Sequence, residues 1–211
     1  MIKQNKVKLI LTSFAILIPV AIGLFLWNDL PDTIATHWGI NGEADGYSSK
    51  AFAVFGLPLV LLAVHWLCVF ATKFDPKHKD INPKMFSVVL WICPAISIVM
   101  NTMAYLIALG KEIKFVSGVI IFMGLLFVII GNFLPKCKQS YTMGIKLPWT
   151  LDNEENWNKT HRMAGVLWVI GGIVIIATAI FESFIIFFSI MALMMIVPTV
   201  YSYMYYKKSK N

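Results

Sequence analysis

The sequence predicts an all-α integral membrane protein with six transmembrane helices, both termini in the cytoplasm, and a short interfacial helix between the fourth and fifth spans. Hydrophobic residues make up 58% of the 211-residue chain, charged residues only 14%, and the mean hydropathy is +0.74. Soluble domains hold about 25% charged residues. Six apolar segments are long enough to cross a bilayer, which takes about 20 residues. Lysine and arginine also gather in alternate connecting segments.

The predicted spans lie near residues 8–27, 51–72, 85–109, 116–134, 163–181 and 184–206. The first follows a lysine-rich start, as a signal peptide does, but no small-residue cleavage site follows it, so we expect it to be retained. The last two spans form one apolar stretch that is too long for a single crossing. This stretch is broken only at Glu182–Ser183, which therefore predicts a tight turn between two antiparallel helices.

The basic residues predict the orientation of the chain. If the N-terminus is inside, only Lys50, Lys111 and Lys114 of the 18 Lys and Arg residues lie outside, and Lys79 is counted among the inner ones. The positive-inside rule then places both termini in the cytoplasm. The connection at 28–50 faces the exterior, and the connection around 136–162 faces the cytoplasm. The net charge of +7 is therefore interpreted as topology, and no direct nucleic-acid partner is expected.

Two domains are predicted, a two-helix membrane domain at 1–84 and a four-helix region at 85–211. The three cysteines, Cys68, Cys93 and Cys137, show no CxxC spacing and no histidine at ligand distance. We expect them to pack as small hydrophobic side chains without disulfides or catalysis.

The outer connection at 28–50 contains the candidate residues of an extracellular site. Its glycines predict a compact, turn-rich structure, and its four acidic residues make it the acidic part of the chain. The candidates are His37, Trp38, Gly42, Asp45 and Lys50. His37 and Asp45 are possible zinc ligands, but the paired spacing of zinc motifs is missing, so no metal is expected. Two interpretations stay open: the rings of His37 and Trp38 anchor the loop at the lipid headgroups, or the loop recognises an extracellular cationic or amphipathic molecule.

Three polar residues fall within the predicted spans, namely His65, Asn101 and Asn132. A single histidine without an intramembrane carboxylate makes a poor proton path. We therefore expect each of the three to form a hydrogen bond between helices.

The inner connection carries the densest polar pattern, "PWTLDNEENWNKTHR" at 148–162. Asp152 is expected to cap a short helix, with Glu155 completing a capping box. Helical spacing places Trp157 and His161 on one face, one turn apart. The tryptophans favour an interfacial helix whose rings lie at the membrane surface.

Two interpretations of this inner connection stay open: a connector that lies on the headgroups, and a platform that docks a cytoplasmic partner. The candidate docking residues are Gly144, Lys146, Pro148, Trp149, Trp157 and His161. The chain contains no nucleophile with its base, no phosphate-binding glycine loop and no paired catalytic carboxylates, so no enzymatic activity is expected.

Both connections resemble known motifs. "LPDTIATHWGINGEADGYSSK" is similar to the signature of a small membrane domain of uncharacterised function, and "GNFLPKCKQSYTMGIKLPWTLDNEENWNKTHRMAG" resembles the C-terminal half of the SdpI family of bacterial immunity proteins. The matching outer positions are Leu30, Pro31, His37, Trp38, Gly42, Asp45 and Lys50. The matching inner positions are Asn132, Gly144, Ile145, Pro148, Trp149, Thr150, Leu151, Trp157, His161 and Gly165. Lys146 and Leu147 stand where the family often has Arg and Thr, and lysine lacks arginine's planar fork.

The resemblance implies a non-enzymatic, multi-pass protein of the bacterial cytoplasmic membrane that needs no cofactor. It implies protection against a secreted antimicrobial peptide toxin at the extracellular side. It also implies signal transduction, in which a small DNA-binding autorepressor is sequestered at the membrane. The alternatives are a peptide transporter or permease, against which the lack of a continuous polar path through the spans argues, and a metal-dependent membrane enzyme.

Overall fold

The computed structural model describes residues 3–77 and 81–210, and Lys79, which was used to predict the orientation, lies outside this range. Within the described residues, six helices are long and apolar enough to cross a membrane. They are α1 (Lys6–Phe25), α2 (Leu57–Lys73), α3 (Pro83–Ala108), α4 (Phe115–Phe133), α6 (Glu154–Thr178) and α7 (Phe184–Lys210). The predicted fold class is confirmed, whereas the orientation of the termini in the membrane stays a prediction.

The shorter elements lie mostly in the connections. A 3-10 turn, η1 (Lys3–Asn5), precedes α1, and a π-helical turn, η2 (Phe52–Gly56), leads into α2. Further 3-10 turns are η4 (Leu134–Lys136) and η5 (Ala179–Phe181), and the short helix is α5 (Pro148–Asp152). After η5, Glu182 adopts a left-handed conformation with φ 49°. The predicted tight turn at Glu182–Ser183 is confirmed.

Two local predictions need correction. The outer connection is more regular than a turn-rich loop, because it forms an antiparallel pair of strands, β1 (Thr33–Trp38) and β2 (Ala44–Ser49). The fifth long helix begins at Glu154, nine residues before the predicted 163. The polar segment before residue 163 is therefore the first part of α6 itself, and one face of it, formed by Asn156, Trp157, Thr160 and His161, is buried.

The chain divides into two compact units, and α2, α3 and α4 each contribute to both. The first unit comprises residues 1–70 and 87–119, and the second comprises 71–86 and 120–211. The predicted division into domains at residue 84 is not tested by this grouping and stays a prediction.

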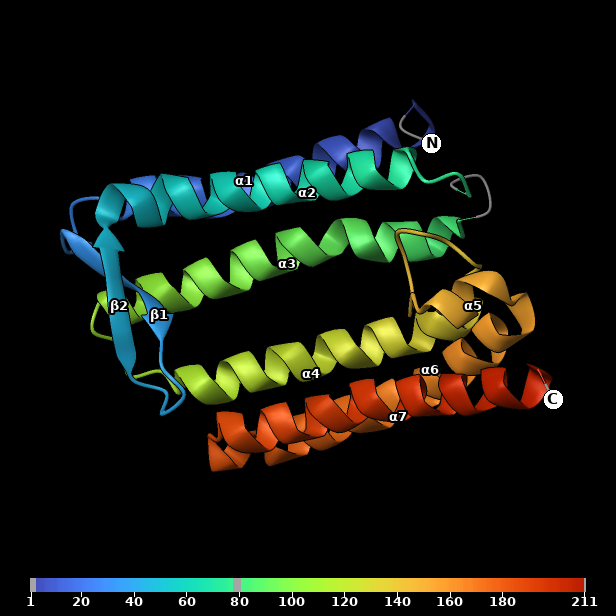
Figure 1. Ribbon diagram of the computed structural model, residues 1–211. Coiled ribbons are helices and arrows are strands. Elements are labelled where there is room, and N and C mark those ends of the chain that lie inside the picture. Colours follow the sequence, from blue (N-terminus) through green and yellow to red (C-terminus); the bar gives the residue numbers. More distant parts are fainter. Residues whose placement is uncertain (1–2, 78–80, 211) are drawn as a thin grey trace. The chain divides into compact units, whose positions relative to one another are not determined.

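In the first unit, α1 lies beside α2, and the hairpin of β1 and β2 follows the C-terminal end of α1 (Figure 1). Leu30 and Ile34 from the start of the hairpin are buried in one cluster with Ala53, Val54, Ala104 and Tyr105. Burial of these apolar side chains fixes the hairpin to the helices, since fully burying one such side chain contributes about 1.5–3 kcal/mol.

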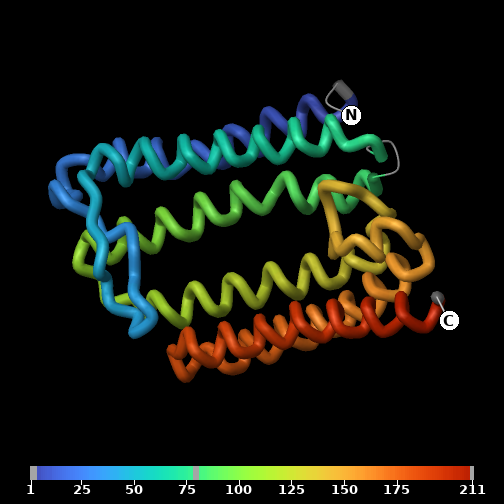
Figure 2. The backbone as a smooth tube through the Cα atoms, in the orientation of Figure 1, coloured from blue at the N-terminus to red at the C-terminus, as the bar shows by residue number. Residues whose placement is uncertain are grey.

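In the second unit, α6 and α7 run antiparallel and side by side (Figure 2). Helix α4 approaches α6 closely at two glycine pairs, Gly124 with Gly172 and Gly131 with Gly165, where an added Cβ would meet backbone oxygen within 3.0 Å. Small residues at such contacts allow close helix packing in membranes.

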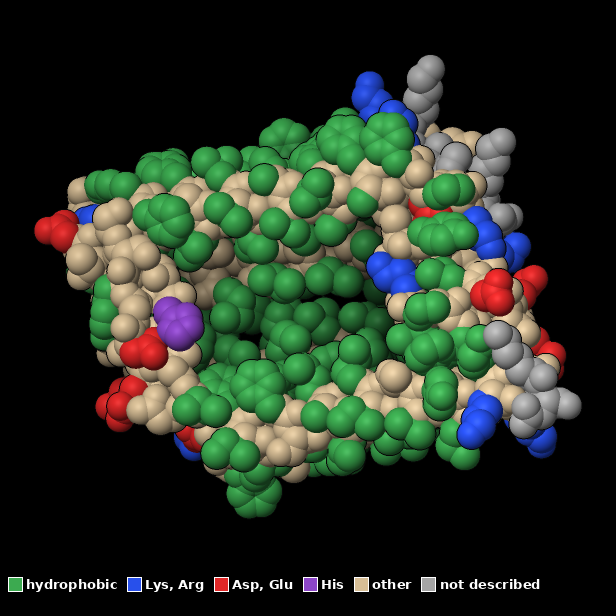
Figure 3. Space-filling view, viewed as in Figure 1, with side chains coloured by type: hydrophobic (Ala, Val, Ile, Leu, Met, Phe, Trp, Pro, Cys, Tyr) green, Lys and Arg blue, Asp and Glu red, His purple; other side chains and the backbone are tan. Residues whose placement is uncertain are grey.

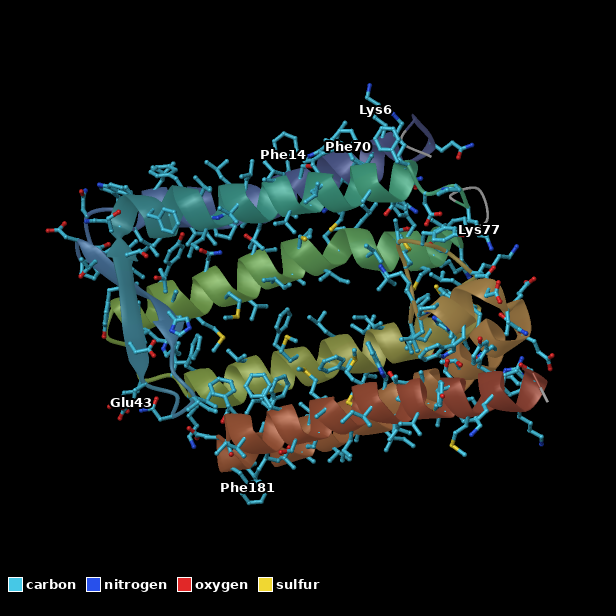
Figure 4. All side chains as sticks on the ribbon, viewed as in Figure 1. Lys6, Phe14, Glu43, Phe70, Lys77 and Phe181 are labelled. Atoms are coloured by element: carbon cyan, nitrogen blue, oxygen red, sulfur yellow. The ribbon has the colours of Figure 1, made fainter. Side chains whose placement is uncertain are left out.

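Hydrophobic side chains cover the flanks of the helices in each unit, whereas charged side chains lie at the helix ends and on the hairpin (Figure 3). Phe14 and Phe70 in the first unit, and Phe181 in the second, point outward (Figure 4) and are exposed. A bilayer supplies the apolar surroundings that such flanks require.

Candidate functional site

The outer candidate residues lie on the hairpin or at its base. Strand pairing places Thr33 opposite Ser49 and His37 opposite Gly46, with irregular register on either side of His37. Between the strands, the amide of Gly42 donates to the carbonyl of Gly39 at 2.9 Å. Gly42 has φ +83° and an added Cβ would lie 2.4 Å from Val116 Cγ2. Only glycine fits this turn, because both the backbone conformation and the neighbouring side chain exclude a Cβ.

Trp38 fixes the hairpin to the start of α4. Its ring stacks on Phe115 with centroids 3.8 Å apart and planes 17° apart. Such aromatic pairs contribute about 0.5–1.5 kcal/mol beyond the area they bury. Trp38 is therefore an internal anchor of the first unit, in addition to any contact that it makes with headgroups.

Lys50 closes the base of the hairpin. Its ammonium donates to the carbonyl oxygens of Leu30 at 2.7 Å and Trp27 at 3.0 Å, and lies 5.3 Å from the Trp27 ring centroid. Its side chain is 15% exposed, and its partner Asp32 is fully exposed. Lys50 thus stabilises the turn that follows α1 by hydrogen bonding to its carbonyl oxygens. Its ammonium points inward, away from the exposed face of the hairpin.

The exposed face of the hairpin combines acid with apolar surface. His37 Nδ1 and Asp45 Oδ1 are 2.5 Å apart, and the two side chains are 72% and 54% exposed. Glu43 lies in the turn (Figure 4). Ile40 and Tyr47 are 66% and 64% exposed. This surface has the chemistry to bind a cationic, amphipathic molecule, because carboxylates flank exposed apolar side chains.

The exposed face of the hairpin supports a metal centre less well than it supports binding of a cationic molecule. Among the residues that the structure describes, no group of three or more His, Cys, Asp and Glu side chains lies close enough to hold a metal ion. His37 and Asp45 therefore form a pair without a third protein ligand in the described part of the chain, whereas structural zinc sites use four ligands and catalytic ones three.

The three intramembrane polar residues behave differently from one another. His65 lies 3.2 Å from Thr12 Oγ1 of α1, which confirms a hydrogen bond between helices. Asn101 instead donates to the carbonyl of Ser97 in its own helix at 2.8 Å. Asn132 is exposed. For Asn101 the prediction of an interhelical bond is wrong, because its own helix offers a carbonyl one turn back. For Asn132 it stays a prediction.

Asp75 organises the start of the inner connection. Its Oδ2 accepts hydrogen bonds from the backbone amides of Tyr141 and Thr142 and from the hydroxyls of Ser140 and Thr142, all at 2.7–2.9 Å. Its Oδ1 accepts from the amide of Lys77 at 2.8 Å. Burial raises the pKa of this carboxyl, but the hydrogen bonds from Ser140, Lys77 and Thr142 outweigh it and hold the pKa below its usual value. Hydrogen bonds to an ionised group are among the strongest in proteins, so Asp75 fixes the segment that follows η4.

Gly144, Trp157 and His161 form one packed cluster. The rings of Trp157 and His161 stack with centroids 4.0 Å apart, which confirms that they share one helix face. His161 Nε2 accepts from the amide of Ile145 at 2.8 Å, so its Nδ1 carries the proton and donates to the carbonyl of Trp157, also at 2.8 Å. Gly144 has φ +109°, and an added Cβ would lie 2.5 Å from His161 Nε2. The cluster fixes the course of residues 144 and 145 against α6.

Trp157 also joins α6 to the segment after α4. Its Nε1 donates to the carbonyl of Cys137 at 2.7 Å. Burial raises the pKa of the Cys137 thiol to about 11, so this thiol is protonated and unreactive at neutral pH. The prediction that Cys137 packs as a small side chain is confirmed for this buried, unbridged residue.

Helix α5 is held by Thr150, whose Oγ1 accepts from the amide of Leu147 and donates to the carbonyl of Ile145, both at 2.9 Å. Trp149 donates to Ser202 Oγ of α7 at 2.5 Å and packs against Tyr203 and Tyr206. A short helix does lie between the fourth and fifth spans, but it covers Pro148–Asp152, whereas the segment predicted to form it, with Trp157 and His161, belongs to α6. Side chains anchor α5 to α7, which the sequence does not indicate.

Several details of the inner prediction are wrong. Asn153, and not Asp152, caps α6, because its side chain accepts from the amide of Asn156. The ring of Trp157 does not lie at a membrane surface, because Trp157 is 0% exposed and His161 is 1% exposed. Of the predicted docking residues, Lys146 and Pro148 are exposed, Gly144 and Trp149 are half-buried, and Trp157 and His161 are buried.

Comparison with known proteins matches the outer and the inner motif regions to two different family models. Residues 136–202, which hold all the inner candidates, match the model of the SdpI/YfhL protein family. Residues 14–62, which hold the outer candidates, match a domain of unknown function, DUF1648. The chain is also 25% identical to "Immunity protein SdpI" of Bacillus subtilis (strain 168) over 209 residues, 98% of this chain and 97% of that relative. The predicted resemblance to the SdpI family is confirmed. With its six apolar helices, the chain is a multi-pass membrane protein of a bacterium. No solved structure is significantly similar.

Three residues that position the two candidate sites were missed by sequence reasoning. Asp75 stands before a proline in a lysine-rich connection, which is a turn signal but does not reveal its partners 65 to 67 residues away. Phe115 and Ser202 lie in apolar stretches, and no local pattern distinguishes them from residues that face lipid.

Proposed function

We propose that this protein protects its cell against a secreted, membrane-damaging peptide. The observation that carries the proposal is the similarity to the SdpI immunity protein along almost the whole chain. This similarity covers both motif regions, the outer hairpin and the inner connection. Both regions take part in the proposed function, so similarity across both favours a shared function more than a match to one region would.

The exposed face of the hairpin supports a role in recognising that peptide. A membrane-damaging peptide is commonly cationic and amphipathic, and the face offers carboxylates beside Ile40 and Tyr47. Residues 28–50 carry four carboxylates against one lysine, Lys50, whose ammonium faces inward. Such a charge imbalance raises the rate at which a cationic partner arrives. We assign recognition to Glu43, Asp45 and His37, and assign positioning of the hairpin to Trp38, Gly42 and Lys50.

A signalling role is the second part of the proposal. Hydrogen bonds with Asp75, Trp157 and His161 hold the inner connection in place. Lys146 and Pro148 remain exposed on it. A rigid exposed surface suits docking of a small DNA-binding repressor, because little ordering entropy is lost on binding. Trp157 and His161 act here by holding the loop. For signalling, peptide and repressor must prefer the same packing of the helices.

The immunity proposal is tested by expressing the chain in a bacterium that is sensitive to the peptide against which the Bacillus subtilis relative confers immunity. We expect survival to rise with the wild type and to fall for the Glu43→Gln/Asp45→Asn variant. Glu112→Gln is the matched control, since it removes an exposed carboxylate outside the hairpin. The proposal is contradicted if cells that express the wild type, with the protein shown to be present in the membrane, survive the peptide no better than cells without it.

The signalling proposal is tested separately with a fluorescent fusion of the small DNA-binding autorepressor that the resemblance to the SdpI family implies. We expect the fusion to move to the membrane when the peptide is added, and to do so less with Lys146→Gln. Lys138→Gln is the control, because Lys138 is also exposed in the same connection. A fusion that stays in the cytosol with and without peptide refutes signalling and leaves immunity standing.

A further inference from the structure

A groove runs between α6 and α7 and is lined by none of the candidate site residues described above. Its volume is about 710 Å³. Its walls are Lys159, Arg162, Val166 and Ile170 of α6, with Tyr201 and Tyr205 of α7. The α6 residues recur at helical spacing, so they form one continuous face. All six come from the second unit, in which α6 and α7 pack along their length.

The groove is polar at one end and apolar along the rest. Lys159 and Arg162 lie near the N-terminal end of α6, and Tyr205 comes from the C-terminal part of α7. From Arg162 to Ile170 the groove follows α6 for about 12 Å, at 1.5 Å per residue. Val166 and Ile170 are 59% and 56% exposed along this length. An occupant that satisfies both ends must carry a negative head and an apolar tail.

The two cations at the polar end, Lys159 and Arg162, differ in their surroundings. Lys159 Nζ lies 2.9 Å from Glu155 Oε1, donates to the Tyr205 hydroxyl at 3.2 Å, and lies 4.5 Å from the Tyr205 ring centroid. Glu155 thus balances the charge of Lys159. Arg162 is exposed and is the only arginine in the sequence. Its planar fork matches phosphate oxygens in a way that a lysine ammonium does not.

We propose that this groove binds one anionic phospholipid, with the phosphate at Arg162 and an acyl chain along Val166 and Ile170. Basic pockets between transmembrane helices on the cytoplasmic side bind anionic headgroups, and the predicted orientation places this end of the groove at the inner leaflet. Lys159 is the second cation of the site, held by Glu155 and Tyr205. The tyrosines lie where the headgroup region favours amphipathic rings.

The test is native mass spectrometry of the full chain, reconstituted with phosphatidylglycerol or with phosphatidylcholine. We expect one retained phosphatidylglycerol per chain and no comparable retention of phosphatidylcholine. Arg162→Gln is expected to weaken retention about tenfold or more, because a charge-assisted hydrogen bond is lost. Arg162→Lys, which keeps the charge without the fork, is expected to fall between that variant and the wild type. Glu155→Gln is expected to strengthen retention, because it leaves the charge of Lys159 uncompensated.

Lys84→Gln is the control for a general loss of charge, since Lys84 is exposed at the start of α3. Thermal unfolding in detergent checks that each variant is folded. The proposal is overturned if the two lipids are retained equally, if Lys84→Gln weakens retention as much as Arg162→Gln, or if Glu155→Gln weakens it. A dimer that excludes lipid and is disrupted by Arg162→Gln overturns it in favour of a second copy of the chain as the occupant.

Discussion

Replacement of Gly144 by alanine tests the cluster that fixes the inner connection. Two costs are expected. The backbone at φ +109° is unfavourable for a residue with a Cβ by about 1–2 kcal/mol. The new methyl group would also lie 2.5 Å from His161 Nε2 and 2.7 Å from Trp157 Cζ2, and such overpacking costs about 1–3 kcal/mol. The expected loss in free energy of unfolding is therefore about 2–5 kcal/mol.

Gly110 provides a control that separates the two costs. It has φ +72°, and an added Cβ would meet no atom within 4 Å. Gly110→Ala is therefore expected to lose only the backbone contribution of about 1–2 kcal/mol. The assay is reversible unfolding of both variants and the wild type in detergent micelles. Equal losses for the two variants would show that Gly144 is not crowded by His161 and Trp157, and the proposed cluster would be refuted.

Four further predictions concern individual residues and contacts. His161→Ala leaves the half-buried amide of Ile145 without its acceptor and removes a buried stacked ring, so unfolding experiments should show a loss of about 2–4 kcal/mol; a loss below 1 kcal/mol contradicts the assignment. A double-mutant cycle of Trp38→Ala and Phe115→Ala should give a coupling energy of about 0.5–1.5 kcal/mol, and additive effects would show that the rings do not interact. Asp75 has a lowered pKa, so the stability that its carboxylate confers is present above its ordinary value of 3.8 and is lost as the pH falls through the native pKa. Asp75→Asn should be less stable at pH 7 and should lack this acid-dependent loss in a pH series of melting temperatures. A maleimide should label Cys137 only after unfolding, in a variant whose other two cysteines are alanine, because a thiol with a pKa of about 11 is almost fully protonated at pH 8.

The six spans were predictable because crossing a bilayer imposes a length and a composition that can be read from a single sequence. The turn at Glu182 followed from the same argument. The start of α6 was not predictable in this way. Asn156 and Thr160 are buried in the first turns of α6, where Asn156 donates to the carbonyl of Ser202 and accepts from Thr160. A polar segment resembles a connector unless its distant partners are known.

The candidate sites were located by their motifs, but the roles of single residues depended on tertiary contacts. Trp157 and His161 shared a face as helical spacing predicts, yet that face is buried and not exposed. Lys50 has the charge of a ligand-binding residue, but its ammonium donates hydrogen bonds to backbone carbonyl oxygens at the base of the hairpin. The strands of the hairpin escaped sequence reasoning because their glycines and irregular register obscure the alternation that identifies a strand.

The central claim, recognition of a cationic peptide by the acidic hairpin, is tested most directly by equilibrium binding. The purified protein in lipid nanodiscs is titrated with the peptide against which the Bacillus subtilis relative confers immunity. We predict an affinity that falls with rising salt and falls again in Glu43→Gln/Asp45→Asn, while Glu112→Gln binds like the wild type. Binding that is unaffected by the hairpin substitutions, or no binding by a folded protein, would contradict the claim.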